Sequence, residues 1–276
     1  MKLLDGKKLS EKILADLKGE IKKNNLKLAL AVVLVGNNSI SKIYIKQKEN
    51  ACKKIGAGFR LFKFSENIKA NELKKGIEQI VQDPDNSGII IQLPLPKNII
   101  NTQEILDIIP AEKDVDVLSE KSLGKLYTGE LKILPPVVCG ISHFFDINNI
   151  NIKGKNILLV GTGKLVGKPL MLWFLRKEAA VSVVNKFTKD ISVFAKNADV
   201  IISGAGVPKL IKGSMVKQGL VAIDAGTVIE KGKLAGDIDF ESVSEKASYI
   251  TPLPGGVGPM TVACLLENLV KLNQKK

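Results

Sequence analysis

Arginine is scarce in this chain of 276 residues, although the chain is strongly basic. Only Arg60 and Arg176 stand among 41 basic residues, and the net charge is +13. Arginine is the residue favoured for bidentate phosphate contacts, so its near absence argues against a nucleic-acid partner. Lysine, isoleucine and asparagine are abundant throughout, which indicates codon bias rather than a selected basic patch.

Histidine and cysteine are also rare. The one histidine, His143, leaves little room for histidine-centred catalysis or a histidine metal site. Cys52, Cys139 and Cys264 are far apart and lack the Cys-x-x-Cys spacing of disulfide frameworks and zinc sites. We therefore predict no metal and interpret the cysteines as small apolar residues.

Long apolar segments are missing as well. No run approaches the roughly 20 residues that span a bilayer, and residues 1–21 form a charged helical pattern rather than the apolar block of a signal peptide. We expect a cytoplasmic globular protein with no membrane partner. The length permits one or two cores, and 45% hydrophobic residues suffice to fill them.

Strands and helices alternate along the first part of the sequence. Residues 6–24 carry apolar side chains at helical spacing, and the apolar run LKLALAVVLVG then ends in glycine, as a buried parallel strand should. The alternation continues with strands near 59–65 and 88–93 and with helices near 39–55, 70–82 and 102–108. This pattern predicts a parallel sheet that is covered on both faces.

A second α/β unit follows a turn-rich region between Asp116 and Gly140. Its strand candidates are NILLVG, VSVVN, DVIISGAG, LVAIDAG and SYITPLPG. The last helix, from Thr261 to about Leu272, follows a loop long enough for it to return to the first domain. We expect a substrate domain of residues 1–120 and 258–276 and a Rossmann-type dinucleotide-binding domain of residues 121–257.

A glycine-rich turn opens this second unit. In GKNILLVGTGKLVGKPL, a strand leads into Gly161, Thr162 and Gly163, and Gly167 then starts a helix. This is the phosphate turn of dinucleotide folds with one extra residue. Glycine lets the backbone approach a pyrophosphate, and free N–H groups at the helix start bind the anion. We predict a dinucleotide site here, the alternative being a turn of purely structural use.

The residues after the next strand favour NADP over NAD. NAD enzymes usually carry an acidic residue there that binds the ribose hydroxyls, whereas this strand ends in Val184-Asn185-Lys186. No carboxylate repels a 2′-phosphate, and Lys186 can pair with it. The alternative is that Lys186 is an ordinary surface lysine, which leaves NAD open. We also expect Thr227, after LVAIDAG, to contact the cofactor.

Lys48 lies on the apolar face of the helix expected over 39–55. Its neighbours at helical spacing are Tyr44, Ala51, Cys52 and Ile55. Such a lysine either extends its stem toward solvent or sits in a desolvated cleft, where its pKa falls and it can exchange protons. Tyr-x-x-x-Lys also occurs in short-chain dehydrogenases. In those enzymes the glycine turn precedes the Tyr/Lys pair, whereas here it follows the pair, so the chain order excludes that class of enzyme.

Four segments resemble the bifunctional methylenetetrahydrofolate dehydrogenase/cyclohydrolase family, and together they cover almost the full length. They are VGNNSISKIYIKQKENACKKIG, IIIQLPLP, EKDVD and ITPLPGGVGPMTVACLLEN. The resemblance implies that Lys48 is the acid/base, that the Tyr44 ring stacks on the folate, that Gln92 hydrogen-bonds near Lys48 and that Asp116 holds the pterin.

The resemblance also implies a reaction and an assembly. The reaction is NADP-dependent oxidation of 5,10-methylenetetrahydrofolate to the methenyl form, then hydrolysis to 10-formyltetrahydrofolate, within one-carbon metabolism and purine biosynthesis. The assembly is a homodimer. Pro254, Gly255 and Gly256 are assigned to substrate binding.

Alternatives stay open at this point. The chain could be a shikimate-dehydrogenase-like enzyme, or a non-catalytic module whose dinucleotide fold only senses NADP(H). Asp116 could cap a helix instead of holding a pterin.

The sequence departs from the family pattern at several positions. The departures are Val117-Leu118-Ser119 for Gly-Phe-His, Val137 for a residue with a hydroxyl, Gly161-Thr162-Gly163 for Gly-Arg-Ser, and Asn185 for histidine. Because they leave Lys48, Gln92 and Asp116 unchanged, they bear on cofactor affinity and on the NADP/NAD choice more than on the reaction.

Overall fold

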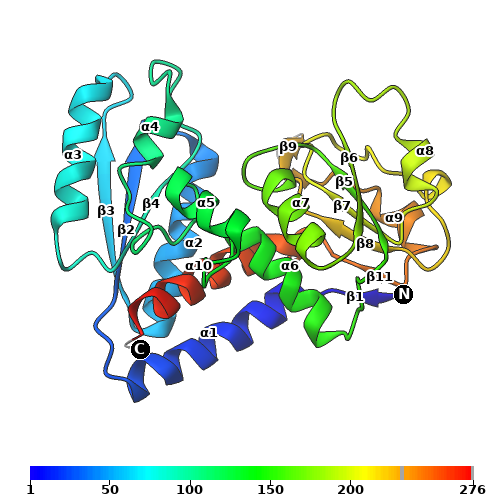
Figure 1. Ribbon diagram of the computed structural model, residues 1–276, viewed down its shortest axis with the longest axis horizontal. Coiled ribbons are helices and arrows are strands. Elements are labelled where there is room, and N and C mark those ends of the chain that lie inside the picture. Colours follow the sequence, from blue (N-terminus) through cyan, green and yellow to red (C-terminus); the bar gives the residue numbers. More distant parts are fainter. Residues whose placement is uncertain (231–232, 275–276) are drawn as a thin grey trace. The chain divides into compact units, whose positions relative to one another are not determined.

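The computed structural model describes residues 1–230 and 233–274. These residues form two compact units, each built on a parallel β-sheet with helices packed against it (Figure 1). The parallel α/β fold class predicted from the alternation of strands and helices is therefore confirmed. Among the described residues, none of the helices combines the length and apolarity that a membrane span requires.

The two units divide the chain differently from the expected domains. Unit 1 comprises Met1–Ser10 and Val137–Thr261, and unit 2 comprises Glu11–Pro136 and Val262–Lys276. The first ten residues thus belong with the glycine-rich turn rather than with the predicted substrate domain, because the N-terminal strand pairs in the sheet of unit 1.

Unit 2 contains a sheet in the order β3-β2-β4. The central strand β2 (Ala29–Val35) pairs in parallel with β3 (Gly58–Phe64) on one side and with β4 (Gly88–Ile91) on the other. The chain leaves β2 for β3 and then crosses back to β4, so the strand order reverses between β2 and β4. In open α/β sheets, ligands bind beyond the carboxyl ends of the strands at such a switch point.

One face of this sheet is covered by α1 (Gly6–Lys23), α2 (Ser39–Ile55) and the C-terminal part of α10 (Val257–Asn273). Alternate residues of β2 point into this core, as the period of two along a strand requires. The expected return of the last helix to the first sheet is confirmed, although the helix begins at Val257 rather than at Thr261.

The opposite face is covered by α3 (Ala70–Gln82) and α4 (Thr102–Leu106). A further helix, α5 (Glu120–Thr128), lies in the turn-rich region between Asp116 and Gly140, where no helix was predicted. The Ser119 hydroxyl caps its start, and Gly129 ends it in a left-handed conformation with φ of 86°. The glycine that signalled a turn is therefore the C-terminal stop of a helix.

Unit 1 contains a six-stranded parallel sheet in the order β1-β11-β8-β7-β5-β6. Its strands are β1 (Lys2–Leu3), β5 (Asn156–Val160), β6 (Ala180–Val184), β7 (Val200–Ser203), β8 (Val221–Asp224) and β11 (Tyr249–Ile250). All five predicted strands are present, and β1 is an addition. Counted from β5, the order is the doubly wound 2-1-3-4-5, with its reversal between β5 and β7.

Helices and a small hairpin complete unit 1. They are α6 (Pro136–Ile147), α7 (Gly167–Arg176), α8 (Ser192–Ala195), α9 (Phe240–Ser244), the 3₁₀ helix Gly213–Met215 and the antiparallel strands β9 (Val228–Glu230) and β10 (Lys233–Ala235). The ring of Phe145 on α6 stacks on Trp173 of α7 with centroids 6.1 Å apart. An aromatic contact therefore holds these two helices together.

Candidate functional site

Lys48 lies in the middle of α2 and is half-buried. Ala51, Cys52 and Ile55, its expected apolar neighbours, are all buried. Burial lowers the pKa of Lys48 from its ordinary value, and the negative charge of Asp116 offsets part of that shift. The side chain therefore sits in a desolvated environment rather than extending into solvent.

Gln92 fixes the position of the Lys48 ammonium. It follows β4 directly, and its backbone N–H donates to the Val33 carbonyl across 2.9 Å. Its side-chain Nε2 donates to the Leu93 carbonyl across 3.0 Å, and Lys48 Nζ donates to Gln92 Oε1 across 2.8 Å. Because the amide nitrogen is already used, the oxygen must face the lysine. The Ser41 hydroxyl, at the start of α2, donates to the same Leu93 carbonyl across 3.4 Å.

Asp116 lies beyond an isolated bridge that joins Asp114 to Ile89 of β4. Burial is the main cause that raises the pKa of Asp116 to about 6, the nearby Lys48 charge lowers it, and Asp114 raises it. Within residues 1–230 and 233–274, no side chain or backbone group donates a hydrogen bond to this half-buried carboxylate. Its acceptor oxygens are available to a ligand.

Asp114, two residues earlier, has the opposite surroundings. Its buried carboxylate accepts from the Leu118 N–H at 3.1 Å, the Ser119 N–H at 2.9 Å and the Ser119 hydroxyl at 2.7 Å. The Ser119 hydroxyl in turn accepts from the Ser122 N–H at 3.2 Å and caps α5. The helix cap that was the alternative role for Asp116 thus belongs to Ser119.

Val117 follows Asp116 in a left-handed conformation with φ of 59°, and its side chain is fully buried. A β-branched residue there is strained, and glycine is the residue that such a conformation favours. This explains physically why the family pattern has glycine at the position.

Tyr44 is half-buried on α2, one helical turn before Lys48. Tyr44 and Lys48 come from the helix that follows β2, while Gln92 and Asp116 come from the segments that end beside β4. The fold of unit 2 thus gathers these residues at the carboxyl edge of its sheet, at the switch point between β2 and β4. Ser41 and Asp114 support them and were missed. The partner of Ser41, Leu93, lies 52 residues further along the chain, whereas Asp114 binds the nearby Leu118 and Ser119 within a turn that the sequence pattern does not mark.

The glycine-rich turn in unit 1 is close-packed on one side and open on the other. A Cβ on Gly167 would lie 2.0 Å from the Gly161 carbonyl oxygen, and one on Gly161 would lie 2.8 Å from the Gly204 oxygen. Nothing lies within 4 Å of a Cβ built on Gly163, and Thr162 and Gly163 are exposed. The backbone therefore offers an uncovered surface before the start of α7, which fits a pyrophosphate group.

Lys186 stands at the tip of the turn after β6. The Asn185 side-chain oxygen accepts from the Phe187 N–H at 3.0 Å, which closes the turn. Lys186 is exposed, with Nζ 5.0 Å from the centre of the Phe187 ring. Thr227 is exposed beyond the end of β8. Both predicted cofactor residues thus lie past the carboxyl ends of strands in the same sheet.

Pro254, Gly255 and Gly256 lie in unit 1, between β11 and α10. The Lys7 N–H donates to the Gly255 carbonyl across 2.9 Å, and a Cβ on Gly6 would lie 1.9 Å from the Gly256 oxygen. The loop therefore packs on the start of α1. A Cβ on Gly256 would lie 2.6 Å from the Pro252 oxygen, and Gly255 has φ of 107°, so both glycines have a structural explanation, and a role in substrate binding stays a prediction.

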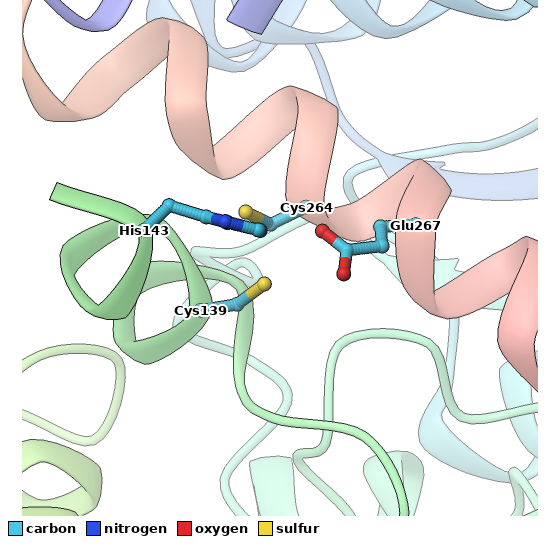
Figure 2. Close-up of side chains that lie close together, drawn as sticks. All are labelled: Cys139, His143, Cys264 and Glu267. Atoms are coloured by element: carbon cyan, nitrogen blue, oxygen red, sulfur yellow. The ribbon is translucent and has the colours of Figure 1, made fainter. Parts of the chain in front are cut away.

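Four side chains of the kinds that ligate metals lie on two helices (Figure 2). Cys139 and His143 are one turn apart on α6, and Cys264 and Glu267 are within one turn on α10. Cys139 and His143 belong to unit 1, and Cys264 and Glu267 belong to unit 2. The three cysteines are buried and form no disulfide.

Comparisons with known proteins decide the family. Residues 135–276 match the family description "Tetrahydrofolate dehydrogenase/cyclohydrolase, NAD(P)-binding domain", and residues 4–116 match the catalytic domain of the same family. The chain belongs to the tetrahydrofolate dehydrogenase/cyclohydrolase family. The resemblance inferred from the four sequence segments is confirmed, and the shikimate-dehydrogenase alternative is set aside.

Individual relatives of this family are similar over the whole length. Bifunctional protein FolD of Hydrogenobaculum sp. (strain Y04AAS1) is 45% identical over 278 residues, with 100% of each chain covered. The crystal structure of FolD from Campylobacter jejuni is 42% identical with a TM-score of 0.94, covering 99% of this chain and 98% of that one. FolD from Trypanosoma brucei, solved with NADP and an inhibitor, is 28% identical with a TM-score of 0.92, covering 98% and 96%.

Proposed function

We propose that the protein oxidises 5,10-methylenetetrahydrofolate with NADP and then hydrolyses the methenyl product to 10-formyltetrahydrofolate, with Lys48 as the acid/base. The observation that carries this proposal is the half-buried Lys48, whose pKa is lowered by burial and whose ammonium is held 2.8 Å from Gln92 Oε1. Full-length similarity to bifunctional FolD proteins supports the reaction.

The oxidation needs alignment more than acid or base. The carbon of the substrate bridges two nitrogens, which share the positive charge that remains once a hydride has left. NADP, when bound, accepts that hydride. The protein contributes the uncovered backbone at Thr162 and Gly163 for the pyrophosphate, and Lys186 and Thr227 for the adenosine side of the cofactor.

The hydrolysis needs a proton acceptor and then a donor. Water attacks the methenyl carbon, and the neutral Lys48 amine removes its proton. The same group returns a proton to the ring nitrogen as its bond to that carbon breaks. A lysine can do both at neutral pH only if its pKa is reduced, as burial does here. Gln92 orients Lys48 without adding a charge.

Tyr44 and Asp116 are proposed to hold the substrate. A pterin ring presents an amide N–H and an exocyclic amino group side by side, which one carboxylate can accept together. Asp116 has a carboxylate that no described group donates to, and an aromatic ring at Tyr44 suits stacking. Pro254, Gly255 and Gly256 are proposed to contact the substrate from the loop before α10.

The proposal is tested by following the absorbance of the methenyl compound in wild type, Lys48→Met and Lys46→Met. Lys46 is the matched control, since it is on the same helix but exposed and paired with Glu49 at 3.0 Å. We expect Lys48→Met to slow methenyl hydrolysis about a hundredfold or more, the range of general acid–base catalysis. Lys46→Met should match wild type. Unchanged hydrolysis in Lys48→Met would remove Lys48 from the mechanism.

We further propose that the enzyme is a cytoplasmic homodimer that supplies one-carbon units to purine biosynthesis. Membership of the family and the absence of a membrane-spanning helix among the described residues support these finer assignments. Light scattering coupled to size-exclusion chromatography gives the molar mass in solution. A mass near that of one 29.9 kDa chain would reject the dimer.

A further inference from the structure

The loop that follows β7 is held by a carboxylate from a distant part of unit 1. Asp237 is fully buried, and its Oδ2 accepts from the Ser203 hydroxyl at 2.7 Å, the Ala205 N–H at 2.6 Å and the Gly206 N–H at 3.2 Å. Its Oδ1 accepts from the Val207 N–H at 2.8 Å. Successive backbone N–H groups that converge in this way form an anion-binding concavity. Here the anion is the protein's own side chain.

The same loop touches the glycine-rich turn at both of its ends. A Cβ on Gly161 would lie 2.8 Å from the Gly204 oxygen and 3.2 Å from the Ala205 nitrogen. A Cβ on Gly204 would lie 2.7 Å from Val166, the residue before α7. The 203–207 loop therefore supports the turn from beneath, and a shift in this loop must move the turn or open a gap under it.

A second buried carboxylate fixes Asp237 itself. Asp224, at the end of β8, accepts from the backbone N–H groups of Asp237 at 3.2 Å and Ile238 at 2.9 Å. A Cβ on Gly226 would lie 2.3 Å from an Asp237 oxygen, and one on Gly236 would lie 2.1 Å from an Asp224 oxygen. Both positions therefore require glycine, and the two carboxylates form a linked chain from β8 to the loop after β7.

We propose that Asp237 is a positioning residue for the dinucleotide: its carboxylate locks the 203–207 loop against Gly161 and Val166 and so sets the shape of the pyrophosphate-binding turn. The two loops meet at the reversal between β5 and β7, where ligands of doubly wound sheets bind. The inference rests on the proposed cofactor site at Thr162 and Gly163, and the experiment separates the two.

The test compares NADPH affinity, measured by fluorescence titration, in wild type and four variants. Asp237→Asn keeps the size but turns one acceptor into a donor that faces a backbone N–H. Ser203→Ala removes one donor without adding a mismatch. Asp199→Asn is the matched control, because Asp199 accepts from Asn156 N–H at 2.8 Å and Lys217 Nζ at 2.7 Å at the opposite, amino edge of this sheet. Gly163→Asp places a negative charge in the proposed cofactor site.

We expect the Kd of NADPH to rise about tenfold in Asp237→Asn and about threefold in Ser203→Ala, corresponding to part of one lost hydrogen bond. The KM for NADP should rise by a similar factor, while kcat at saturating NADP changes less than twofold. Asp199→Asn should bind as wild type does. Melting temperatures and near-ultraviolet circular dichroism establish that each variant is folded at the temperature of the titration.

Each other outcome is informative. If Gly163→Asp weakens NADPH binding and Asp237→Asn lowers only the melting temperature, Asp237 is merely structural and the inference is wrong. If Gly163→Asp leaves the Kd unchanged, the proposed cofactor site itself fails, and the inference fails with it. If Asp237→Asn does not fold, Ser203→Ala decides, and an unchanged Kd in that variant overturns the inference.

Discussion

The aspartates at the carboxyl edges of the two sheets differ in the hydrogen bonds that they accept, although burial raises the pKa of both Asp116 in unit 2 and Asp224 in unit 1 to about 6. At the edge of unit 2, the Asp116 carboxylate receives no hydrogen bond from the described residues, and burial moves the pKa of both Asp116 and Lys48 toward neutrality. At the edge of unit 1, Asp237 accepts four hydrogen bonds and Asp224 accepts three from backbone N–H groups.

This difference in hydrogen bonding indicates which aspartates have a structural role and which can interact with a ligand. A carboxylate saturated by backbone donors is a structural anion, since its lone pairs are used and its position is fixed. A buried charge that lacks such donors is costly, and such groups cluster where a ligand or a proton is to be exchanged. We propose that hydrogen-bond saturation distinguishes, within one chain, the aspartates that shape loops from Asp116, the one proposed to contact substrate.

The sharpest test of this distinction compares two aspartates that are two residues apart. Asp116→Asn replaces one free acceptor by a donor that faces the donors of the pterin, a mismatch of about 1–3 kcal/mol. We expect kcat/KM for folate to fall roughly ten- to a hundredfold in both activities. Asp114→Asn weakens the hydrogen bonds that the Leu118 and Ser119 N–H groups donate to the Asp114 carboxylate. It should therefore lower the free energy of unfolding by about 1–3 kcal/mol. Steady-state assays and thermal melts measure both effects.

The difference in stability between wild type and Asp116→Asn should depend on pH, because the pKa of Asp116 is raised in the folded protein. Asp116 titrates at about 6 in the folded protein against 3.8 for the ordinary value, so between these pH values the folded state holds the proton more tightly. Stability conferred by this group therefore falls as the pH rises from 3.8 to 6 and stays reduced above. Relative to wild type, Asp116→Asn should melt higher at pH 8, with the gain vanishing toward pH 4. A lower melting temperature at pH 8 would show that Asp116 is structural.

A smaller effect is expected at Lys186, which is exposed and lies in unit 1. Lys186→Asp should lower the ratio of kcat/KM for NADP to that for NAD about tenfold, because an exposed attraction is replaced by a repulsion of the 2′-phosphate. Lys189→Asp, also exposed and three residues further on, controls for the change in net charge. If wild type already prefers NAD, the charge argument for Lys186 fails.

The sequence predicted the parallel sheets and the place of Lys48 on the apolar face of its helix, because strand alternation and helical spacing are local signals. It left open whether the Lys48 side chain extends to solvent or sits in a desolvated cleft. The roles of Gln92 and Asp116 came only from the family resemblance. The Asp237 network was missed because its carboxylate binds Ser203, 34 residues earlier, and a strand pattern does not reveal such a partner. Helix α5 was missed because Gly124 and Gly129 were weighted as turn residues, although Ser119 before Glu120 is a helix start.

The smallest expected effect concerns Val117, the strained residue beside Asp116. Replacing it by alanine removes most of a buried side chain and leaves the left-handed strain, whereas glycine removes the side chain and the strain together. Elsewhere glycine is less stable than alanine by about 0.5–1 kcal/mol, but a left-handed residue with a Cβ costs roughly 1–2 kcal/mol.

We therefore expect Val117→Gly to be at least as stable as Val117→Ala, and both to be less stable than wild type because valine fills its site. Both activities of Val117→Gly should stay within about twofold of wild type, since Asp114 rather than Val117 anchors the turn through Leu118 and Ser119. Thermal melts rank the three proteins. A glycine variant less stable than the alanine variant would mean that φ of 59° carries no strain, and a large loss of activity would mean that the strain itself aims Asp116 at the substrate.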